Sequence, residues 1–169
     1  MIDTANHPAV AVETFRDAMR LTASGVAVVT SDGAAGRTGV TVSSLCSLSM
    51  EPPSVVFCVH RESRSLATLL ENGVFVANIL SEAQERVANS FAGLIPELRD
   101  DRFAAGAWTN LTTGAPALDE ALCNFDCRVA SVFDFGSHRI LTGEVIGVRT
   151  QAANPLVFSD RAFRRLAAA

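Results

Sequence analysis

The stretch VSSLCSLSMEPPSVVFCVHRESRS, residues 42–65, joins an apolar segment to an unusual number of hydroxyl groups. Val55 to Val59 is apolar and rich in β-branched residues, which predicts a strand. Pro52 and Pro53 before it force extended backbone and interrupt a sheet ladder. A buried strand has no use for many side-chain donors, whereas a binding site has. The segment therefore predicts a strand and one wall of a binding site, with hydroxyls at Ser43, Ser44, Ser47 and Ser49.

Further strands are predicted on both sides of this stretch. Val26 to Ser31 and Arg37 to Ser47 flank the turn signal DGAAG and form a hairpin, and Val74 to Leu80 follows as another apolar run. Strict alternation over CNFDCRVASVF, the turn GSHR and the run ILTGEVIGVRT predict a second hairpin. Leu156 to Phe158 is expected to be a short last strand.

Three helices are expected outside these strands. The first runs from about Glu13 to Thr22 with an apolar face, the second starts at an N-cap Ser63 and stops at Gly73, and the third runs from Ser81 through about Phe91. Residues 93–118 carry Gly, Pro or Asn every few positions and are expected to be a long functional or interface loop with weak structure. Six or seven mostly antiparallel strands with three outer helices predict an α+β domain, mainly β, built on a small barrel.

Composition narrows the class of protein. A chain of 169 residues with 49% hydrophobic and 19% charged residues is expected to form one domain, residues 13–166, after a flexible N-terminus of residues 1–12. A net charge of -4 provides no general field for nucleic acid or an anionic membrane, and no apolar stretch approaches the length of a membrane helix. The N-terminus lacks a secretory pattern, so we expect the cytoplasm. The four cysteines lack metal-site spacing and are expected to be buried thiols, so no metal is predicted.

The residues alone offer three candidate binding features. Ser63, Arg64 and Ser65 at a helix start suit a phosphate, although an ordinary serine cap with a solvated arginine has the same sequence. Thr41 and the nearby serines suit a flat polar heterocycle with a polyol chain, although a strand with one wet face looks the same. His138 in a predicted turn is placed to reach a ligand or to lie in solvent. Motifs of Rossmann folds, P-loops, HExxH metal sites and GxSxG hydrolases are absent from the sequence.

Taken in order, these segments resemble the short-chain flavin reductase family, the reductase components of two-component flavin-dependent monooxygenases such as those acting on 4-hydroxyphenylacetate and chlorophenols. The resemblance covers about Phe15 to Leu166. Its landmarks are FRDAMRLTASGVAVVTS, GVTVSSLCSLSMEPPSVVFCVHRESRS, GVFVANIL, SFAG, DDRF, TGAPALDEALCNFDCRV, GSHRILTGEV and PLVF.

The resemblance implies a six-stranded antiparallel split β-barrel with flanking helices, a homodimer, and FMN or FAD bound near the subunit interface. By position, contacts to the isoalloxazine and ribityl groups would come from Thr41, Val42, Ser43, Ser44 and Ser47. Many relatives carry Asn where this chain has Ser43, whose single hydroxyl has a shorter reach. Cys46 occupies the position of a VCS motif typical of aromatic-hydroxylase reductases and is read as a small residue packed beside the ring.

The remaining expected contacts lie further along the chain. Ser63, Arg64 and Ser65 would hold the flavin phosphate, and the resemblance places Phe91 and Arg102 at the border of the cofactor. His138, in the family's G-x-H turn, would approach the nicotinamide.

The implied activity is hydride transfer from NADH or NADPH to flavin, with the reduced flavin passing to a partner monooxygenase, transiently bound or reached by diffusion. Such chemistry belongs to the cofactor and requires no side-chain nucleophile. Two alternatives remain open at this stage: a split-barrel protein that binds or senses flavin without catalysis, and another split-barrel enzyme, such as a pyridoxamine-phosphate oxidase relative or a corrin reductase with tightly held FMN.

Overall fold

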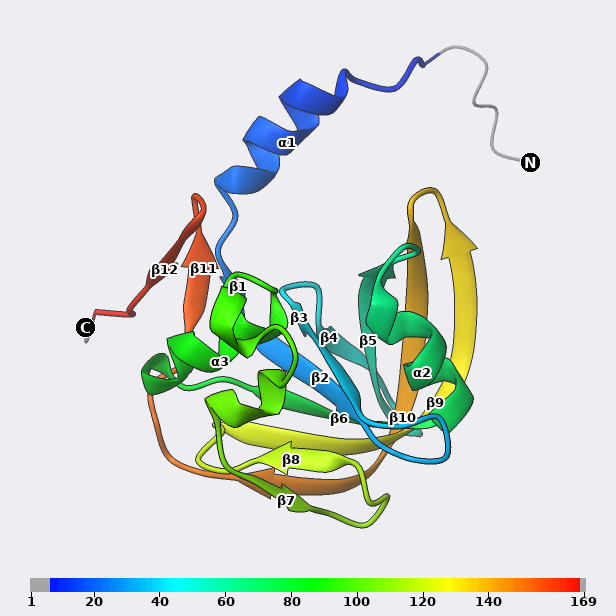
Figure 1. Cartoon of the computed structure of the whole chain (residues 1–169). Coiled ribbons are helices and arrows are strands. Elements are labelled where there is room, and N and C mark those ends of the chain that lie inside the picture. Colours follow the sequence, from blue (N-terminus) through cyan, green and yellow to red (C-terminus); the bar gives the residue numbers. More distant parts are fainter. Residues whose placement is uncertain (1–6, 168–169) are drawn as a thin grey trace.

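The computed structural model describes residues 7–167 and shows a mainly-β α+β fold (Figure 1). Its centre is a seven-stranded antiparallel sheet in the order β3-β2-β6-β9-β10-β5-β4. The strands are β2 (Ala27–Ser31), β3 (Thr38–Val42), β4 (Cys46–Met50), β5 (Pro53–His60), β6 (Val74–Ile79), β9 (Cys123–Phe135) and β10 (His138–Thr150).

The two edge strands of this sheet, β3 and β4, are consecutive in the chain. Arg37 to Ser47 was expected to be a single strand, but residues 43–45 carry no strand pairing, so the strand is broken there. Its first half pairs with β2 and its second half with β5. When the two halves are counted as one strand, six strands close on themselves with a split at residues 43–45. The expected split barrel is confirmed.

Two apolar cores lie on opposite faces of the curved sheet. Alternate residues of β2 explain the division, because Val29 contributes to the barrel interior with Phe57 and Phe75, while Val28 contributes to an outer core with Phe91. All five residues of β2 are buried as a result. This accounts for the apolar run Val26 to Val29, where a half-exposed strand would alternate.

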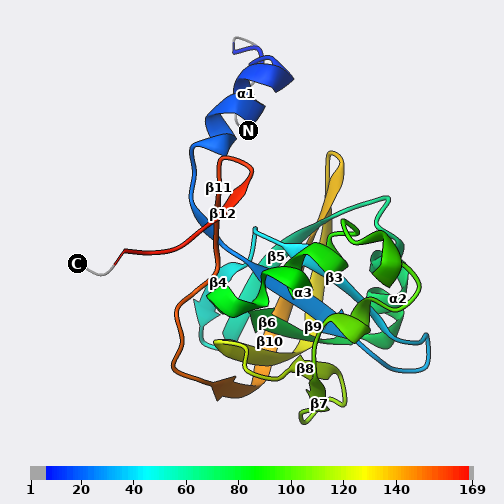
Figure 2. The same cartoon turned by 60° about the vertical axis from the view of Figure 1, so that its left-hand side comes forward.

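Two of the three helices pack on the barrel. Helix α2 (Arg64–Asn72) starts after Ser63 as expected and ends at Gly73, whose φ of 68° is left-handed. Helix α3 (Glu85–Phe91) follows a 3-10 turn, η1 (Glu82–Gln84), and the expected Ser81–Gln84 capping box is present. In Figures 1 and 2 these two helices lie over the barrel on either side of β3.

The first helix and the C-terminal hairpin form an outlying pair. Helix α1 (Val12–Arg20) is shorter than expected and has no buried residue within the described chain. It projects from the barrel above a small sheet of β1 (Ser24–Gly25), β11 (Val157–Ser159) and β12 (Ala162–Arg164) (Figures 1 and 2). The last of these strands was not predicted. Residues 1–6 of the N-terminus expected to be flexible lie outside the described residues.

Residues 93–118 are more ordered than expected. They form two 3-10 turns, η2 (Pro96–Leu98) and η3 (Arg102–Ala105), and a two-stranded sheet of β7 (Trp108–Asn110) and β8 (Pro116–Leu118). Buried amides hold this segment against the barrel, since Leu118 N donates to Asn78 Oδ1 at 2.8 Å and Asn124 Nδ2 donates to Leu118 O at 3.1 Å. The prediction of weak structure was therefore wrong, because these anchoring partners come from distant strands.

Candidate functional site

The split in the barrel opens into a hollow of about 410 Å3, which falls in the range of small-molecule sites. One wall is the end of β3 and the broken segment, and the other is the end of β5 with the start of α2. His138, the first residue of β10, lies at one end. The residues that line it are Val40, Thr41, Val42, Ser43, Ser44, Cys58, Val59, His60, Ser63 and His138.

The hydroxyls of the opening stretch have distinct local roles. Ser44 bridges the split, because its Oγ accepts from Cys58 N at 2.9 Å and lies 3.3 Å from Cys58 O, to which it donates. Thr41 Oγ1 donates to Ala88 O at 2.7 Å and so ties β3 to α3. Ser43 is exposed and borders the hollow, and Ser63 has no side-chain capping bond. Ser43 and Ser63 therefore retain hydroxyls that can face a ligand.

Two histidines meet at the mouth of this hollow. His60 and His138 are direct partners in the β5–β10 register, and their ring centroids lie 5.1 Å apart in an edge-to-face arrangement. His60 Nδ1 accepts from Glu62 N at 3.3 Å, while His138 Nδ1 lies 2.9 Å from Ser137 Oγ. The first bond leaves the proton of neutral His60 on Nε2, which can donate to a ligand. His60 was absent from the predicted site because strand register places it there.

A second hollow, of about 360 Å3, adjoins the first along β3 and α2. Thr38 and Gly39 line the second hollow, and the next residues of β3 line the first. Likewise, Ser63 borders the first and Arg64 the second. The predicted residues in the second hollow are Arg64, Ser65, Phe91 and Arg102, and the structure adds Arg37, Arg99, Asp100, Asp101 and Phe103.

The second hollow has a rigid floor. Ser65 is buried and its Oγ donates to Gly39 O at 2.7 Å, which fixes the start of α2 against β3. Phe91 is buried beneath, and Arg102 Nη1 donates to Phe91 O at 3.4 Å. A Cβ atom on Gly39 would lie 2.5 Å from the Phe91 ring, so this contact requires glycine.

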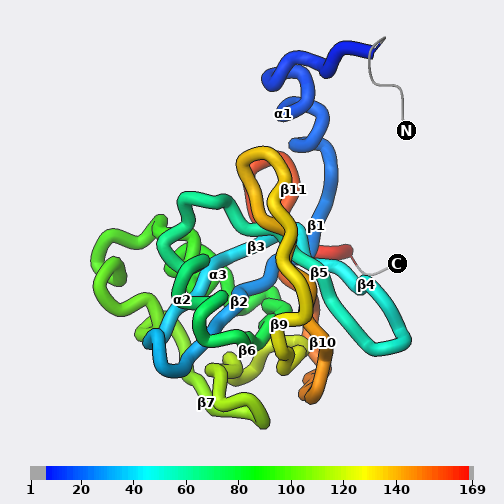
Figure 3. Tube along the Cα trace, turned by 90° about the vertical axis from the view of Figure 1, so that its right-hand side faces the viewer, coloured from blue at the N-terminus to red at the C-terminus, as the bar shows by residue number. Residues whose placement is uncertain are grey.

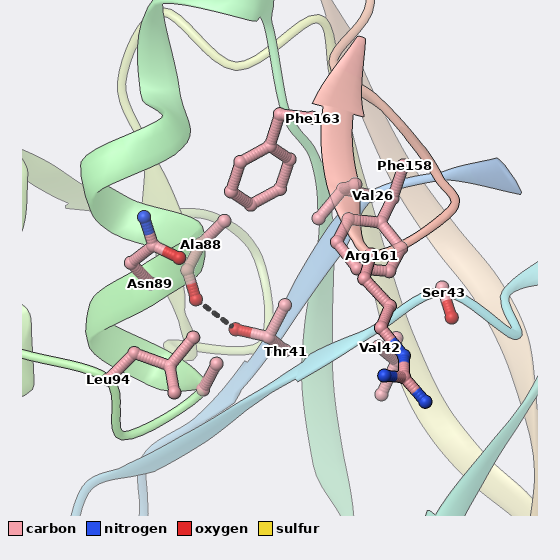
Figure 4. A pocket seen from close by; sticks show the side chains of 11 residues that line it. Val26, Thr41, Val42, Ser43, Ala88, Asn89, Leu94, Phe158, Arg161 and Phe163 are labelled. Carbon is pink, nitrogen blue, oxygen red and sulfur yellow. Dashed lines mark hydrogen bonds between the residues drawn. The ribbon is translucent and has the colours of Figure 1, made fainter. Parts of the chain in front are cut away.

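A third, more apolar pocket of about 310 Å3 shares Thr41, Val42 and Ser43 with the first hollow. Figure 4 shows it between α3 and the C-terminal hairpin, with Phe158, Arg161 and Phe163 on the hairpin side. The turn that carries Arg161 has left-handed φ values at Asp160 and Arg161, 48° and 60°.

One predicted site residue lies apart from the others. Ser47 is exposed on β4 and lines a different, apolar hollow of about 320 Å3 with Met50 and Phe125. The structure thus groups ten of the eleven predicted residues around two adjoining hollows and separates Ser47.

The four cysteines are free thiols, but only Cys127 among them is buried, so the expectation of buried thiols was wrong for the other three. Cys46 is exposed and lines the apolar hollow of Ser47, not the first hollow. Burial raises the pKa of the Cys127 thiol to about 12, with a smaller contribution from the Asp126 carboxylate. Burial also raises the pKa of Cys123. Within residues 7–167 no cluster of His, Cys, Asp and Glu is arranged to hold a metal ion, and none of the helices there is long and apolar enough to cross a membrane.

Comparison with known proteins bears on the role of these hollows. The family model of the flavin reductase like domain matches residues 19–167. The FMN reductase (NADH) RutF 1 of Methylorubrum extorquens strain PA1 is 42% identical over 169 residues, which span 98% of this chain and 83% of the relative.

Solved structures agree with the sequence match. A Haemophilus somnus 129PT protein assigned as a flavin reductase superposes with a TM-score of 0.87 at 35% identity, over 93% of this chain and 100% of that chain. Nitrilotriacetate monooxygenase component B from Mycobacterium thermoresistibile gives a TM-score of 0.84 at 31% identity, over 92% of this chain and 86% of that chain.

Proposed function

The chain belongs to the flavin reductase-like domain family, and from this we propose that it is an NADH-dependent FMN reductase that supplies reduced flavin to a partner monooxygenase. The observation that carries the proposal is the ring-sized hollow at the barrel split, which adjoins a cationic hollow along β3 and α2. The flavin ring would occupy the hollow at the barrel split, and the flavin phosphate would occupy the cationic hollow beside it.

The donor groups fit a flavin mononucleotide. Residues 43–45 have no sheet partner, so their main-chain groups remain for a polar ring edge, whereas Thr41 and Val42 are paired to β2. Ser43 and Ser63 add hydroxyls suited to ring and ribityl oxygens, and Arg64 supplies a cation at the phosphate end. Phe91 and Arg102 support the phosphate hollow from α3 and η3.

When bound, the flavin supplies a ring that accepts hydride from the nicotinamide. The chain therefore needs no nucleophile; its residues bind the two rings, align them and exclude water. His138 and His60 at the mouth would hold a carboxamide, and residues of the split would bind the flavin ring. Unpaired main-chain N–H groups of residues 43–45 would stabilise negative charge that develops at the edge of that ring.

A homodimer forms part of the proposal. Helix α1 presents Phe15 and Met19 to solvent with exposed fractions of 58% and 50%, and the β9–β10 hairpin presents Phe133 and Phe135. Such exposed apolar side chains suit a contact with a second copy of the chain. The cytoplasm remains our predicted location.

The test measures NADH and NADPH oxidation by the purified protein with FMN, FAD or riboflavin added in turn. We expect turnover that requires flavin, with NADH preferred over NADPH and FMN accepted. Flavin binding seen by fluorescence quenching without any pyridine-nucleotide oxidation would contradict the reductase and favour a flavin-binding module.

A further inference from the structure

Four arginines converge on the second hollow from three parts of the chain. Arg37 precedes β3, Arg64 opens α2, and Arg99 and Arg102 come from the segment of η2 and η3. The hollow also holds Asp100 and Asp101, so four cations face two carboxylates and a formal charge of two remains unbalanced. Resemblance had pointed to Arg64 and Arg102 alone.

None of these four guanidinium groups forms an ion pair with a described residue. Within residues 7–167, a carboxylate lies within 4.0 Å of six other arginines, which are Arg20, Arg61, Arg128, Arg139, Arg149 and Arg165. Asp101 is engaged elsewhere, since its Oδ1 accepts from Phe103 N at 3.1 Å. The hollow therefore concentrates cations that no ion pair within the described chain engages.

Two of these guanidinium groups are held in place by neighbours that are not anions. Arg37 Cζ lies 3.7 Å from the centroid of the Phe103 ring, a cation–π contact. Phe103 is itself fixed edge-to-face against Phe91 and Trp108, at 4.9 and 5.0 Å between centroids. Arg102 is anchored on Phe91 O. These contacts hold the two guanidinium groups in position and do not neutralise their charge, which favours tight binding of an anion.

We propose that Arg37 and Arg99 complete a phosphate-ester subsite with Arg64 and Arg102, and that this subsite makes the enzyme select phosphorylated over unphosphorylated ligand. The inference rests on the proposed function and adds the residues that set its specificity. The shared chemistry is a phosphate ester, which FMN carries on its ribityl chain and NADH carries as a diphosphate. The adjoining ring hollow favours the flavin phosphate as occupant.

The first test is equilibrium binding of FMN and of riboflavin, measured by flavin fluorescence. We expect Arg37→Ala and Arg99→Ala each to weaken FMN binding by about 5- to 20-fold, as loss of a charge-assisted hydrogen bond does, with riboflavin binding unchanged. Arg37→Lys keeps the charge and should recover part of the loss. Arg86→Ala is the matched control, because Arg86 is exposed on α3, makes no ion pair within residues 7–167, and lies outside the hollow.

A second arm distinguishes the two phosphate sources. With riboflavin as acceptor, a raised KM for NADH in Arg37→Ala and Arg99→Ala, and unchanged FMN binding, would assign the subsite to the NADH diphosphate and still support it. The proposal would be overturned if the variants lost affinity for FMN and for riboflavin equally. It would also be overturned if neither FMN binding nor the KM for NADH changed. Because the first arm needs no turnover, selective FMN binding without NADH oxidation would refute the reductase and leave the subsite standing.

Discussion

His138 owes its place at the mouth of the first hollow to strand register. The turn of Gly136 and Ser137 starts β10 opposite the end of β5, so His138 faces His60 and their rings pack edge-to-face. Neither histidine lines the second hollow, where we propose that the flavin phosphate binds. At the residue scale, the histidines should therefore affect the nicotinamide and leave the flavin phosphate untouched.

His138→Ala is predicted to raise the KM for NADH by roughly 5- to 20-fold, the effect of losing one hydrogen bond or ring contact. Flavin affinity should stay within about 2-fold of the wild type. Steady-state kinetics and flavin fluorescence titration measure the two effects. His7→Ala is the control, since His7 lines none of these hollows. An equal loss of flavin affinity in His138→Ala would contradict the nicotinamide role.

Cys127 makes stability sensitive to alkaline pH. Its folded pKa, about 12, lies above the ordinary value of 9.0. The contribution of the Cys127 thiol to the free energy of unfolding is therefore complete below pH 9 and is lost as pH rises toward 12. At pH 10 the free energy of unfolding is lower by about 1.4 kcal/mol. The sequence contains no lysine and no tyrosine, so cysteines are the side chains that titrate in this range.

We predict that the Tm falls between pH 8 and about pH 10.5, and that Cys127→Ala makes this decline clearly shallower. Differential scanning calorimetry at a series of pH values measures the Tm of both proteins. Cys46→Ala is the matched control, because Cys46 is exposed. A decline as steep in Cys127→Ala as in the wild type would show that other groups govern the alkaline transition.

At the scale of elements, the break between β3 and β4 borders the first hollow and interrupts the strand pairing of the barrel at the same point. Residues 43–45 give up strand pairing, and the Ser44 side chain replaces it with two bonds to the main chain of Cys58 on β5. The turn joining β4 to β5 reaches outward from the body in Figure 3. One hydroxyl therefore helps to close the barrel beside the proposed flavin ring.

Ser44→Ala should lower the free energy of unfolding by about 1 kcal/mol, the net value of such bonds at an exposed position, and should weaken flavin binding. Chemical denaturation measures the first effect. Ser47→Ala, three residues along and without a side-chain partner in the described chain, should change stability by less than about 0.5 kcal/mol. If both variants lost stability equally, Ser44 would have no special role in closure. Loss of flavin affinity in Ser47→Ala would bring Ser47 back into the proposed site.

At the scale of the whole molecule, α1 is amphipathic yet none of its residues is buried within the described chain. Its last turn is tied to the C-terminal hairpin, where Arg20 Nη2 donates to Asp160 Oδ1 at 2.7 Å and Asp160 N donates to Arg20 O at 2.9 Å. The helix is thus held at one end and offers Val12, Phe15 and Met19 to a partner. This arrangement supports the proposed homodimer.

We predict that the protein sediments as a dimer and that the double substitution Phe15→Asp with Met19→Asp shifts it toward the monomer. Buried charge at an apolar contact is strongly unfavourable, which is the reason for the shift. Thr14→Asp places one charge on another face of α1 and should leave the dimer intact. Sedimentation velocity gives the answer, and a wild-type monomer at micromolar concentration would refute the dimer.

The sequence by itself determined the fold class, the family and most of the helix and strand positions. Local patterns sufficed for these: Ser63 and Gly73 mark the ends of α2, Ser81 and Gln84 cap the next turn, and alternation defines β9. The residues that resemblance assigned to the flavin also come together, apart from Ser47. These features depend on neighbours close in the chain or on motifs read in order.

The tertiary structure alone decided the break at residues 43–45, the order of residues 93–118, the pairing of His60 with His138, and the gathering of Arg37 and Arg99 with Arg64 and Arg102. Each depends on contacts between segments far apart in the sequence, such as Leu118 with Asn78 or Arg37 with Phe103. Local propensity carries no information on strand register or on which loop meets which helix. Those choices follow from burying both faces of one closed sheet at once.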